Sequence, residues 1–124
     1  MINIEDFAKV EIRAGKILSV EEIDGSEKLL KLSVDFGEEE EMGEGTSPKE
    51  PATSVRGRQV ISGIKKYFED PQSLVGTTCA FVTNLEPRAI MGLESQAMIM
   101  AFSGDNFFSL LKISENVPLG SLVR

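Results

Sequence analysis

The segment EKLLKLSVDFG at residues 27–37 decides the fold class, because apolar and polar side chains alternate without a break from residue 30 to residue 36. Successive side chains of a β-strand point to opposite faces of the sheet, so the alternation predicts a strand with one face in the core. Gly37 then ends the strand with a turn signal. The apolar face consists of Leu30, Leu32, Val34 and Phe36, and the polar face of Lys31, Ser33 and Asp35.

Short strand-like segments recur along the rest of the chain at intervals of roughly ten residues, with little helical periodicity, which predicts an all-β barrel or sandwich. In residues 10–20 the apolar side chains fall on even positions, but the alternation breaks at Lys16 and Ile17. Gly15 lies beside this break. It either marks a bulge or corner of the strand or is an ordinary strand glycine. Further strands are expected at residues 58–63, 77–85 and 95–102, with strand-like segments beyond them at 107–113 and 117–123.

One short helical turn is expected at residues 70–74. Asp70 suits the N-cap position, Pro71 suits the first helical position, and Gly76 follows as a terminator. The turn lies between the third and fourth expected strands, the place where an OB-fold carries a helix. We therefore predict a five-stranded OB-fold barrel with a short helix and a C-terminal strand-like extension.

Composition limits the possible chemistry. The 124 residues suit one domain, spanning residues 1–124. Histidine is absent and no carboxylate pair stands out, so we expect no enzymatic activity, no metal and no cofactor. Cys79 lies in an apolar run and is expected in the core, in a reducing compartment. No apolar leader or membrane-spanning run is present, which predicts a cytoplasmic protein without membrane contact.

Residues 38–57 differ in composition from the rest of the chain. They hold six glutamates against Lys49 and Arg56, a net charge of −4 out of the chain's −7. Glycine, serine, threonine and proline fill the gaps, and such a segment cannot bury enough apolar surface to offset its ordering entropy. We expect an acidic, flexible insert at a hairpin tip. The alternative is an acidic arm that shields a basic face or binds a basic partner.

The sequence also resembles a known family. NLEPRAIMGLESQAMIMA at residues 84–101, RQVISGI at residues 58–64 and EKLLKLSVDFG together resemble the tRNA-binding domain family. That family includes stand-alone tRNA-binding proteins, the C-terminal domain of many methionyl-tRNA synthetases, the endothelial monocyte-activating polypeptide domain and the secretion chaperone CsaA. The resemblance runs from residue 6 to the C-terminus, apart from the acidic segment.

The resemblance implies non-catalytic, structure-specific but sequence-tolerant tRNA binding, either stand-alone or as an accessory domain of an aminoacyl-tRNA synthetase. Two alternatives are a CsaA-like chaperone or protein-interaction module, and a dimerisation appendage without a ligand. Members of this size pair, so a homodimer is expected. The apolar tail that pairing would cover consists of Phe107, Phe108, Leu110, Leu111, Val117, Leu119, Leu122 and Val123.

Candidate RNA-binding residues are of two kinds. Cations on strands and loops that a barrel could bring to one face are Lys28, Lys31, Arg58, Lys65 and Arg88, whereas Lys66 is interpreted as a solubilising charge. The resemblance adds Ser62, Asn84, Ser95 and Met98 as residues that line the RNA-facing groove. A strand serine can instead bond its own sheet, and a methionine is often core filler.

Two departures from the family pattern bear on affinity. Glu86 and Ala89 stand where many relatives carry lysine beside the residue equivalent to Arg88. Phosphate contacts supply most of the affinity in non-specific binding. The sequence therefore predicts weak tRNA binding.

Overall fold

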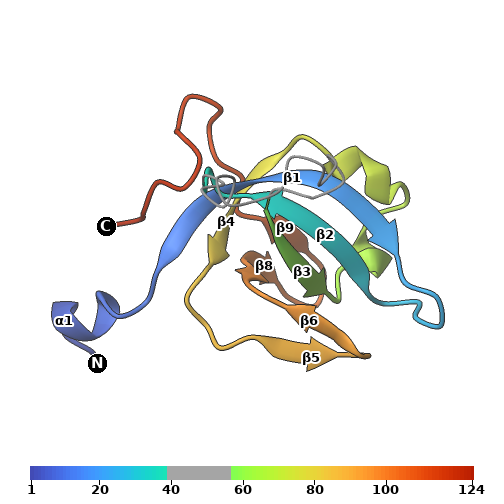
Figure 1. The fold of residues 1–124 in the computed structure, drawn as a ribbon, viewed down its shortest axis with the longest axis horizontal. Helices are drawn as coiled ribbons and strands as arrows, with labels where there is room; N and C mark the ends of the chain where they lie inside the picture. Colours follow the sequence, from blue (N-terminus) through green and yellow to red (C-terminus); the bar gives the residue numbers. More distant parts are fainter. Residues whose placement is uncertain (39–56) are drawn as a thin grey trace, which may run out of the picture.

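In the computed structural model, which describes residues 1–38 and 57–124, β1 (Ile12–Glu22) pairs with two strands at once. Its second half pairs with β2 (Leu30–Asp35) and its first half with β4 (Thr78–Val82), as Figure 1 shows. β3 (Arg58–Ser62) and β7 (Met98–Ile99) complete an antiparallel sheet of order β3-β2-β1-β4-β7. The sheet curls into a nearly closed barrel, which confirms the predicted all-β OB-like fold.

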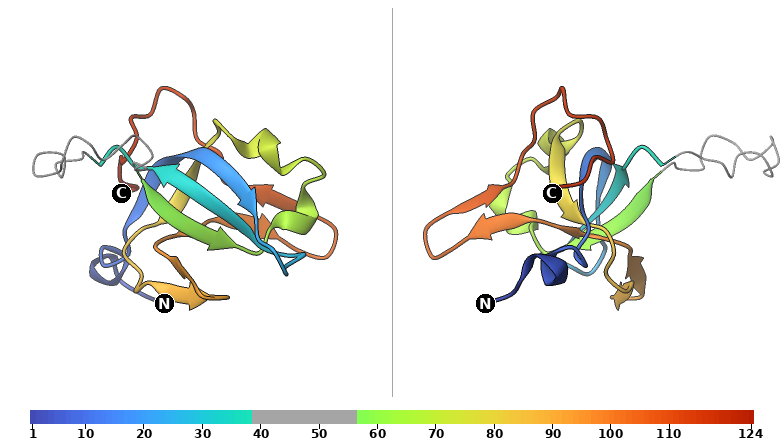
Figure 2. Two further views of the ribbon diagram at one scale, coloured as in Figure 1. Left: turned by 45° about the vertical axis from the view of Figure 1, so that its right-hand side comes forward. Right: turned by 90° about the vertical axis from the view of Figure 1, so that its left-hand side faces the viewer.

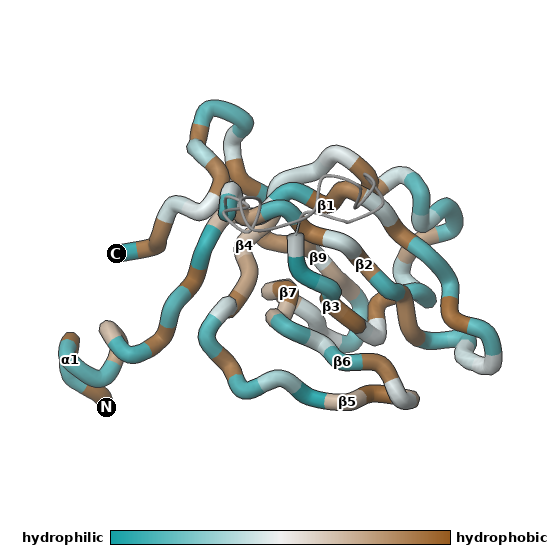
Figure 3. The backbone as a smooth tube through the Cα atoms, in the orientation of Figure 1, coloured by the Kyte–Doolittle hydropathy of each residue, from teal (hydrophilic) through white to brown (hydrophobic). Residues whose placement is uncertain are grey.

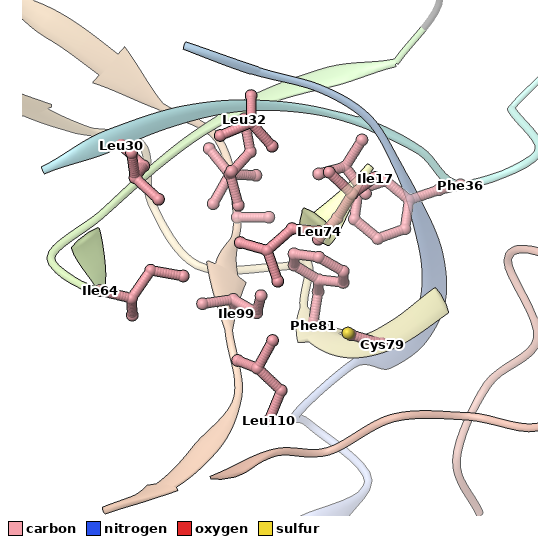
Figure 4. Close-up of a cluster of buried hydrophobic side chains, with 14 residues drawn as sticks. Ile17, Leu30, Leu32, Phe36, Ile64, Leu74, Cys79, Phe81, Ile99 and Leu110 are labelled. Atoms are coloured by element: carbon pink, nitrogen blue, oxygen red, sulfur yellow. The ribbon is translucent and has the colours of Figure 1, made fainter. Parts of the chain in front are cut away.

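The alternation in β2 is confirmed. Leu30, Leu32 and Val34 are completely buried, and they pack with Phe36 and Phe81 in one apolar cluster (Figure 4). Apolar and polar residues alternate visibly along β2 in Figure 3. Cys79 is buried in the same cluster, as expected, and burial raises the pKa of its thiol.

The bulge in β1 lies at Leu18 and not at Gly15. Ile17 pairs with Val34 and Ser19 with Ser33, so Leu18 is the extra residue. The even-numbered pattern of residues 10–20 holds for Ala14 and Val20, which are buried, and fails for Leu18, which is exposed. Because the bulge shifts the alternation, the buried position before it is Ile17 and the next one after it is Val20.

Gly15 has a packing role. A Cβ atom there would lie 2.5 Å from Cε1 of Phe36 and 2.7 Å from Cγ1 of Val34. Only a residue without a side chain lets β1 approach these two core residues so closely.

Within residues 1–38 and 57–124, three short helices accompany the barrel. The predicted turn is the 3-10 helix η2 (Pro71–Leu74), in which Oδ1 of Asp70 accepts a hydrogen bond from the backbone N–H of Gln72 at 3.2 Å. The sequence did not indicate α1 (Ile4–Phe7) or η1 (Lys65–Tyr67). Among the described residues, no helix has the length and apolar character needed to span a bilayer.

Residues 95–102 are not the single strand expected. They fall into β6 (Leu93–Ser95), β7 and β8 (Ala101–Ser103), because each piece pairs with a different strand. β6 pairs with β5 (Arg88–Ile90), and β8 pairs with β9 (Phe108–Leu110) in a hairpin that projects from the barrel (Figure 2). The turn between β5 and β6 is Met91-Gly92, both at positive φ (54° and 80°), as a two-residue type I′ hairpin requires.

The C-terminal extension packs against the barrel, as predicted, but residues 117–123 form no strand. Isolated bridges join Lys112 to Cys79 and Leu122 to Arg13. Nη1 of Arg13 also donates to the backbone oxygen of Gly120 at 2.9 Å. The predicted acidic insert at 38–57 lies outside the described residues except for its two ends.

We expect Gly15→Ala to destabilise the protein by about 1–3 kcal/mol, because the added methyl group overpacks the contact with Phe36 and Val34. The matched control is Gly63→Ala, whose Cβ would meet no atom closer than 3.8 Å. Its free energy of unfolding should equal or slightly exceed that of the wild type. Urea denaturation measures both, and equal stabilities of the two variants would contradict the packing role of Gly15.

Candidate nucleic-acid interface

Four of the predicted site residues meet in one hollow, which we call the hairpin hollow. It has a volume of about 80 Å³ and lies between β3, the β5–β6 hairpin and β7. Its floor is apolar, and Arg88 and Glu86 are its charged residues. The predicted residues that line it are Ser62, Arg88, Ser95 and Met98.

Two predicted cations line a second hollow of about 260 Å³, which we call the strand hollow. Lys31 of β2 and Arg58 of β3 contribute to it, together with Ser33, Gln59 and Gln96. Its lining is more polar than that of the hairpin hollow, and Glu21 also contributes to it. Among the described residues, the buried Ser33 hydroxyl has no hydrogen-bond partner.

A pair of glutamines lies where the barrel closes, at the strand hollow. The backbone N–H of Gln96 donates to the backbone oxygen of Gln59 at 2.8 Å, and the backbone N–H of Gln59 donates to Oε1 of Gln96 at 2.8 Å. The two hollows thus share β3, with Gln59 in one and Ser62 in the other. Sequence reasoning missed both glutamines, because their role depends on which strands meet at the closure.

Ser95 and Met98 have different surroundings within the hairpin hollow. Ser95 is buried, and its Oγ accepts a hydrogen bond from the backbone N–H of Ile61 at 3.0 Å and donates one to the backbone oxygen of Ala97 at 3.1 Å. Its hydroxyl therefore helps to close the barrel. Met98 is 48% exposed at the mouth of the hollow, so it is not core filler and its thioether is accessible.

Asn84 does not join the other predicted residues. Its Oδ1 accepts a hydrogen bond from the backbone N–H of Glu11 at 2.8 Å, and its Nδ2 donates to the backbone oxygen of Lys9 at 2.7 Å. It fixes the segment before β1. Beside it, hydrogen bonds from Arg13 and Thr83 lower the pKa of the Glu11 carboxyl, and the same pairing raises the pKa of Arg13.

Three of the five predicted cations contact a glutamate. Lys31 lies 3.5 Å from Glu21 and Lys65 lies 3.0 Å from Glu22, each measured from Nζ to Oε1. Nη2 of Arg58 lies 2.7 Å from Oε2 of Glu38. Within residues 1–38 and 57–124, Lys28 and Arg88 form no such pair.

Arg58 is also held by the barrel itself. Its Nη1 donates to the backbone oxygen of Thr83 at 2.7 Å, and its guanidinium lies 5.4 Å from the centre of the Phe36 ring. Arg58 is thus an anchor between β3 and the end of β4 as well as a charge in the strand hollow.

Sequence reasoning missed Glu21, although it lies directly opposite Lys31 in the β1–β2 register, since that register depends on the bulge.

In the part of the chain that the structure describes, no three His, Cys, Asp or Glu side chains gather as metal ligands would. The hairpin hollow is an apolar cleft with an exposed arginine, and the strand hollow is a more polar cleft that contains Lys31, Arg58 and Glu21. That combination suits a ligand with phosphates and planar or ribose groups.

Comparison with known proteins is consistent with this geometry. The family model described as "Putative tRNA binding domain" matches residues 52–122. Methionine–tRNA ligase of Methanospirillum hungatei is 44% identical over 123 residues, which is 99% of this chain and 16% of the ligase. The chain therefore spans only a small part of such relatives.

Two solved structures share the fold over the whole chain. The MetRS related protein from Pyrococcus horikoshii has a TM-score of 0.81 and 29% identity, covering 100% of this chain and 98% of that one. The chaperone CsaA from Bacillus anthracis has a TM-score of 0.75 and 23% identity, covering 100% and 99%. At that identity the second likeness concerns the fold alone.

We expect Ser95→Ala to lower the free energy of unfolding by about 1–3 kcal/mol, because it leaves the buried N–H of Ile61 without a partner. Met98→Ala should change the free energy of unfolding by no more than about 0.5 kcal/mol, as is usual for an exposed side chain. Urea denaturation of both variants tests the assignment. A large loss of stability in Met98→Ala would show that Met98 belongs to the core.

Proposed function

Because this chain belongs to the tRNA-binding domain family, we propose that it binds tRNA, without catalysing a reaction, on the face that holds the hairpin hollow and the strand hollow. The observation that carries the proposal is the convergence of Ser62, Arg88 and Met98, from β3, β5 and β7, on one cleft. These residues are far apart in the sequence, and only the closure of the barrel brings them together.

The two kinds of contact have separate roles in this proposal. Arg88 and Lys28 are exposed and contact phosphates, which fixes position but carries no sequence information. Met98 and the apolar floor of the hairpin hollow receive a ribose or a base. Binding is therefore tolerant of sequence and responds to the shape of the RNA backbone.

The glutamates around this face lower its affinity. Carboxylate and phosphate groups compete for the same arginine and lysine donors, so RNA must displace Glu21, Glu22 and Glu38 to reach the three paired cations. Glu86 adds a further negative charge beside Arg88. The resulting complex is weak, and because few phosphates are contacted its salt dependence is modest.

The small share of the ligase length that this chain covers supports an accessory, non-catalytic role. A chain that covers 16% of a methionine–tRNA ligase acts as an accessory module for tRNA capture, either within a synthetase or next to one in the cytoplasm. A chaperone or protein-interaction module and a dimerisation appendage are the competing functions, and the binding experiment distinguishes them from RNA capture.

We expect tRNA titrations at several salt concentrations to give a slope of log K against log salt of roughly −2 to −3, as for about three neutralised phosphates. Arg88→Ala should lower affinity for all tRNAs alike and flatten the slope by nearly one. Glu86→Lys with Ala89→Lys should raise affinity, most at low salt. If neither the wild type nor this double variant binds tRNA at low ionic strength, the proposal fails and an interaction module takes its place.

The same titration tests the shielding glutamates. The triple variant Glu21→Gln, Glu22→Gln and Glu38→Gln should bind more tightly and with a steeper slope, because it frees Lys31, Lys65 and Arg58. A control removes equal charge at exposed sites outside both hollows. It consists of Glu5→Gln, Asp105→Asn and Glu115→Gln. Equal gains in the two triple variants would show a general charge effect.

We further propose a homodimer, through an apolar groove of about 340 Å³ between α1 and the C-terminus. Ile4, Val10 and Val123 in this groove are 75%, 42% and 50% exposed. Only part of the expected tail lies there. Leu110 is buried in the barrel's own core and Phe108 packs against it, which leaves Leu122 and Val123 as the tail residues of the groove.

Light scattering at micromolar concentration should give the mass of a dimer for the wild type and of a monomer for the double variant Ile4→Ser and Val123→Ser, since polar side chains weaken an apolar contact. Phe102→Ser is the control, because Phe102 is 62% exposed on the projecting hairpin and does not line the groove. It should remain dimeric. A monomeric wild type would refute the dimer.

A further inference from the structure

Three aromatic rings extend from the apolar core to the surface beside η1. The ring of Tyr67 stacks on that of Phe108, with centroids 3.9 Å apart and planes 4° apart, and Phe68 meets Phe108 edge-on at 5.8 Å. Phe68 and Phe108 pack against the core cluster, whereas Tyr67 is 40% exposed. The outermost ring is therefore held in a fixed orientation by the rings behind it.

Two lysines flank this stack. Nζ of Lys66 lies 5.2 Å from the centre of the Tyr67 ring, and because Phe108 covers one face of that ring, Lys66 lies over the other. Lys112 lines the same open hollow of about 410 Å³ as Tyr67 and Phe108. Unlike Lys31 and Lys65, neither lysine is paired with a carboxylate within residues 1–38 and 57–124.

We propose that this aromatic hollow, lined by Tyr67, Phe108 and Lys112 and flanked by Lys66 over the Tyr67 ring, binds one unpaired nucleotide of RNA. The base stacks on the outer face of Tyr67, and the two lysines contact the phosphates on either side. A positively charged groove with an aromatic platform is the combination that single-stranded nucleic acids require. The inference rests on the proposed function and adds a second contact to it.

The charge of the hollow favours a nucleotide over an apolar peptide, because two unpaired cations beside an aromatic ring complement a phosphate and a base together. Lys66 is exposed, so its ammonium can leave the ring face and follow a phosphate when a base arrives. From the sequence Lys66 was interpreted as a solubilising charge, and its position over Tyr67 gives it this contact role. Lys65 precedes it on η1, which directly follows β3 and Ser62 of the hairpin hollow.

The chain offers a direct optical test, because Tyr67 is its only tyrosine and it contains no tryptophan. Tyrosine emission therefore reports on the aromatic hollow alone. Titration with hexauridylate, an unpaired RNA, should quench this emission in a saturable way. Free N-acetyltyrosinamide in the same RNA solutions corrects for absorption by the bases. No saturable quenching would overturn the inference.

Variants separate stacking from charge, with affinity measured by the anisotropy of labelled hexauridylate. Tyr67→Ala should bind roughly tenfold more weakly with an unchanged salt slope, because it removes a stacking surface only. Tyr67→Phe should bind like the wild type. Lys66→Gln with Lys112→Gln should flatten the slope by about 1.4, because each phosphate contact to a single strand contributes about 0.7. Phe102→Ala, which alters an exposed ring outside the hollow, is the control and should have no effect.

The outcomes distinguish this inference from the proposed function. If Tyr67→Ala and the lysine variant bind hexauridylate like the wild type while tRNA binding still depends on Arg88, the inference is wrong and the proposed function stands. If hexauridylate quenches Tyr67 but tRNA does not bind, the hollow is a nucleotide site and the proposed function fails. A Tyr67→Ala variant that changes from dimer to monomer would identify the stack as a protein interface and refute the inference.

Discussion

The last side of the barrel is closed largely by side-chain hydrogen bonds, and the proposed binding face depends on that closure. Where a regular ladder would join β3 to β6 and β7, Ser95 and Gln96 hydrogen-bond to the backbone of β3. A buried backbone N–H needs a partner, so these two residues replace the missing ladder bonds. They also fix the β5–β6 hairpin beside β3, and through it the position of Arg88 over the hairpin hollow.

The five predicted cations divide into paired and unpaired ones. Lys31, Lys65 and Arg58 each contact a glutamate, whereas within residues 1–38 and 57–124 Arg88 and Lys28 contact none. Exposed ion pairs contribute little to stability. The main effect of the glutamates is therefore to reduce the positive potential around the paired cations. A chain with a net charge of −7 still has accessible cations for a phosphate, among them Arg88.

Much of the fold could be predicted from local sequence patterns, and the features that could not be predicted have physical reasons. The alternation at residues 30–36 and the Asp70-Pro71 start of η2 are local signals, and both predictions are confirmed. The bulge at Leu18 and the division of residues 95–102 into three strands depend on which strands pair, which no local pattern reveals. The left-handed conformation of Met91 in the hairpin turn could not be predicted, because a positive φ is uncommon for such a residue. For the site, the resemblance supplied the residue types, but not the glutamates that pair with them or the distant position of Asn84.

The double pairing of β1 also bears on how the chain folds. Lys16 pairs with Asp35 of β2 and with Thr78 of β4. The first pairing joins strands that are adjacent in the sequence, and the second joins residues that are half of the chain apart. Loop-closure entropy favours the nearer pairing first, and non-local strand pairing slows folding. We therefore expect the half of β1 beside β2 to form early and the half beside β4 to form with the rest of the barrel. Both hollows depend on β3 and on residues after β5, so we expect the proposed binding face to be among the last parts of the molecule to form.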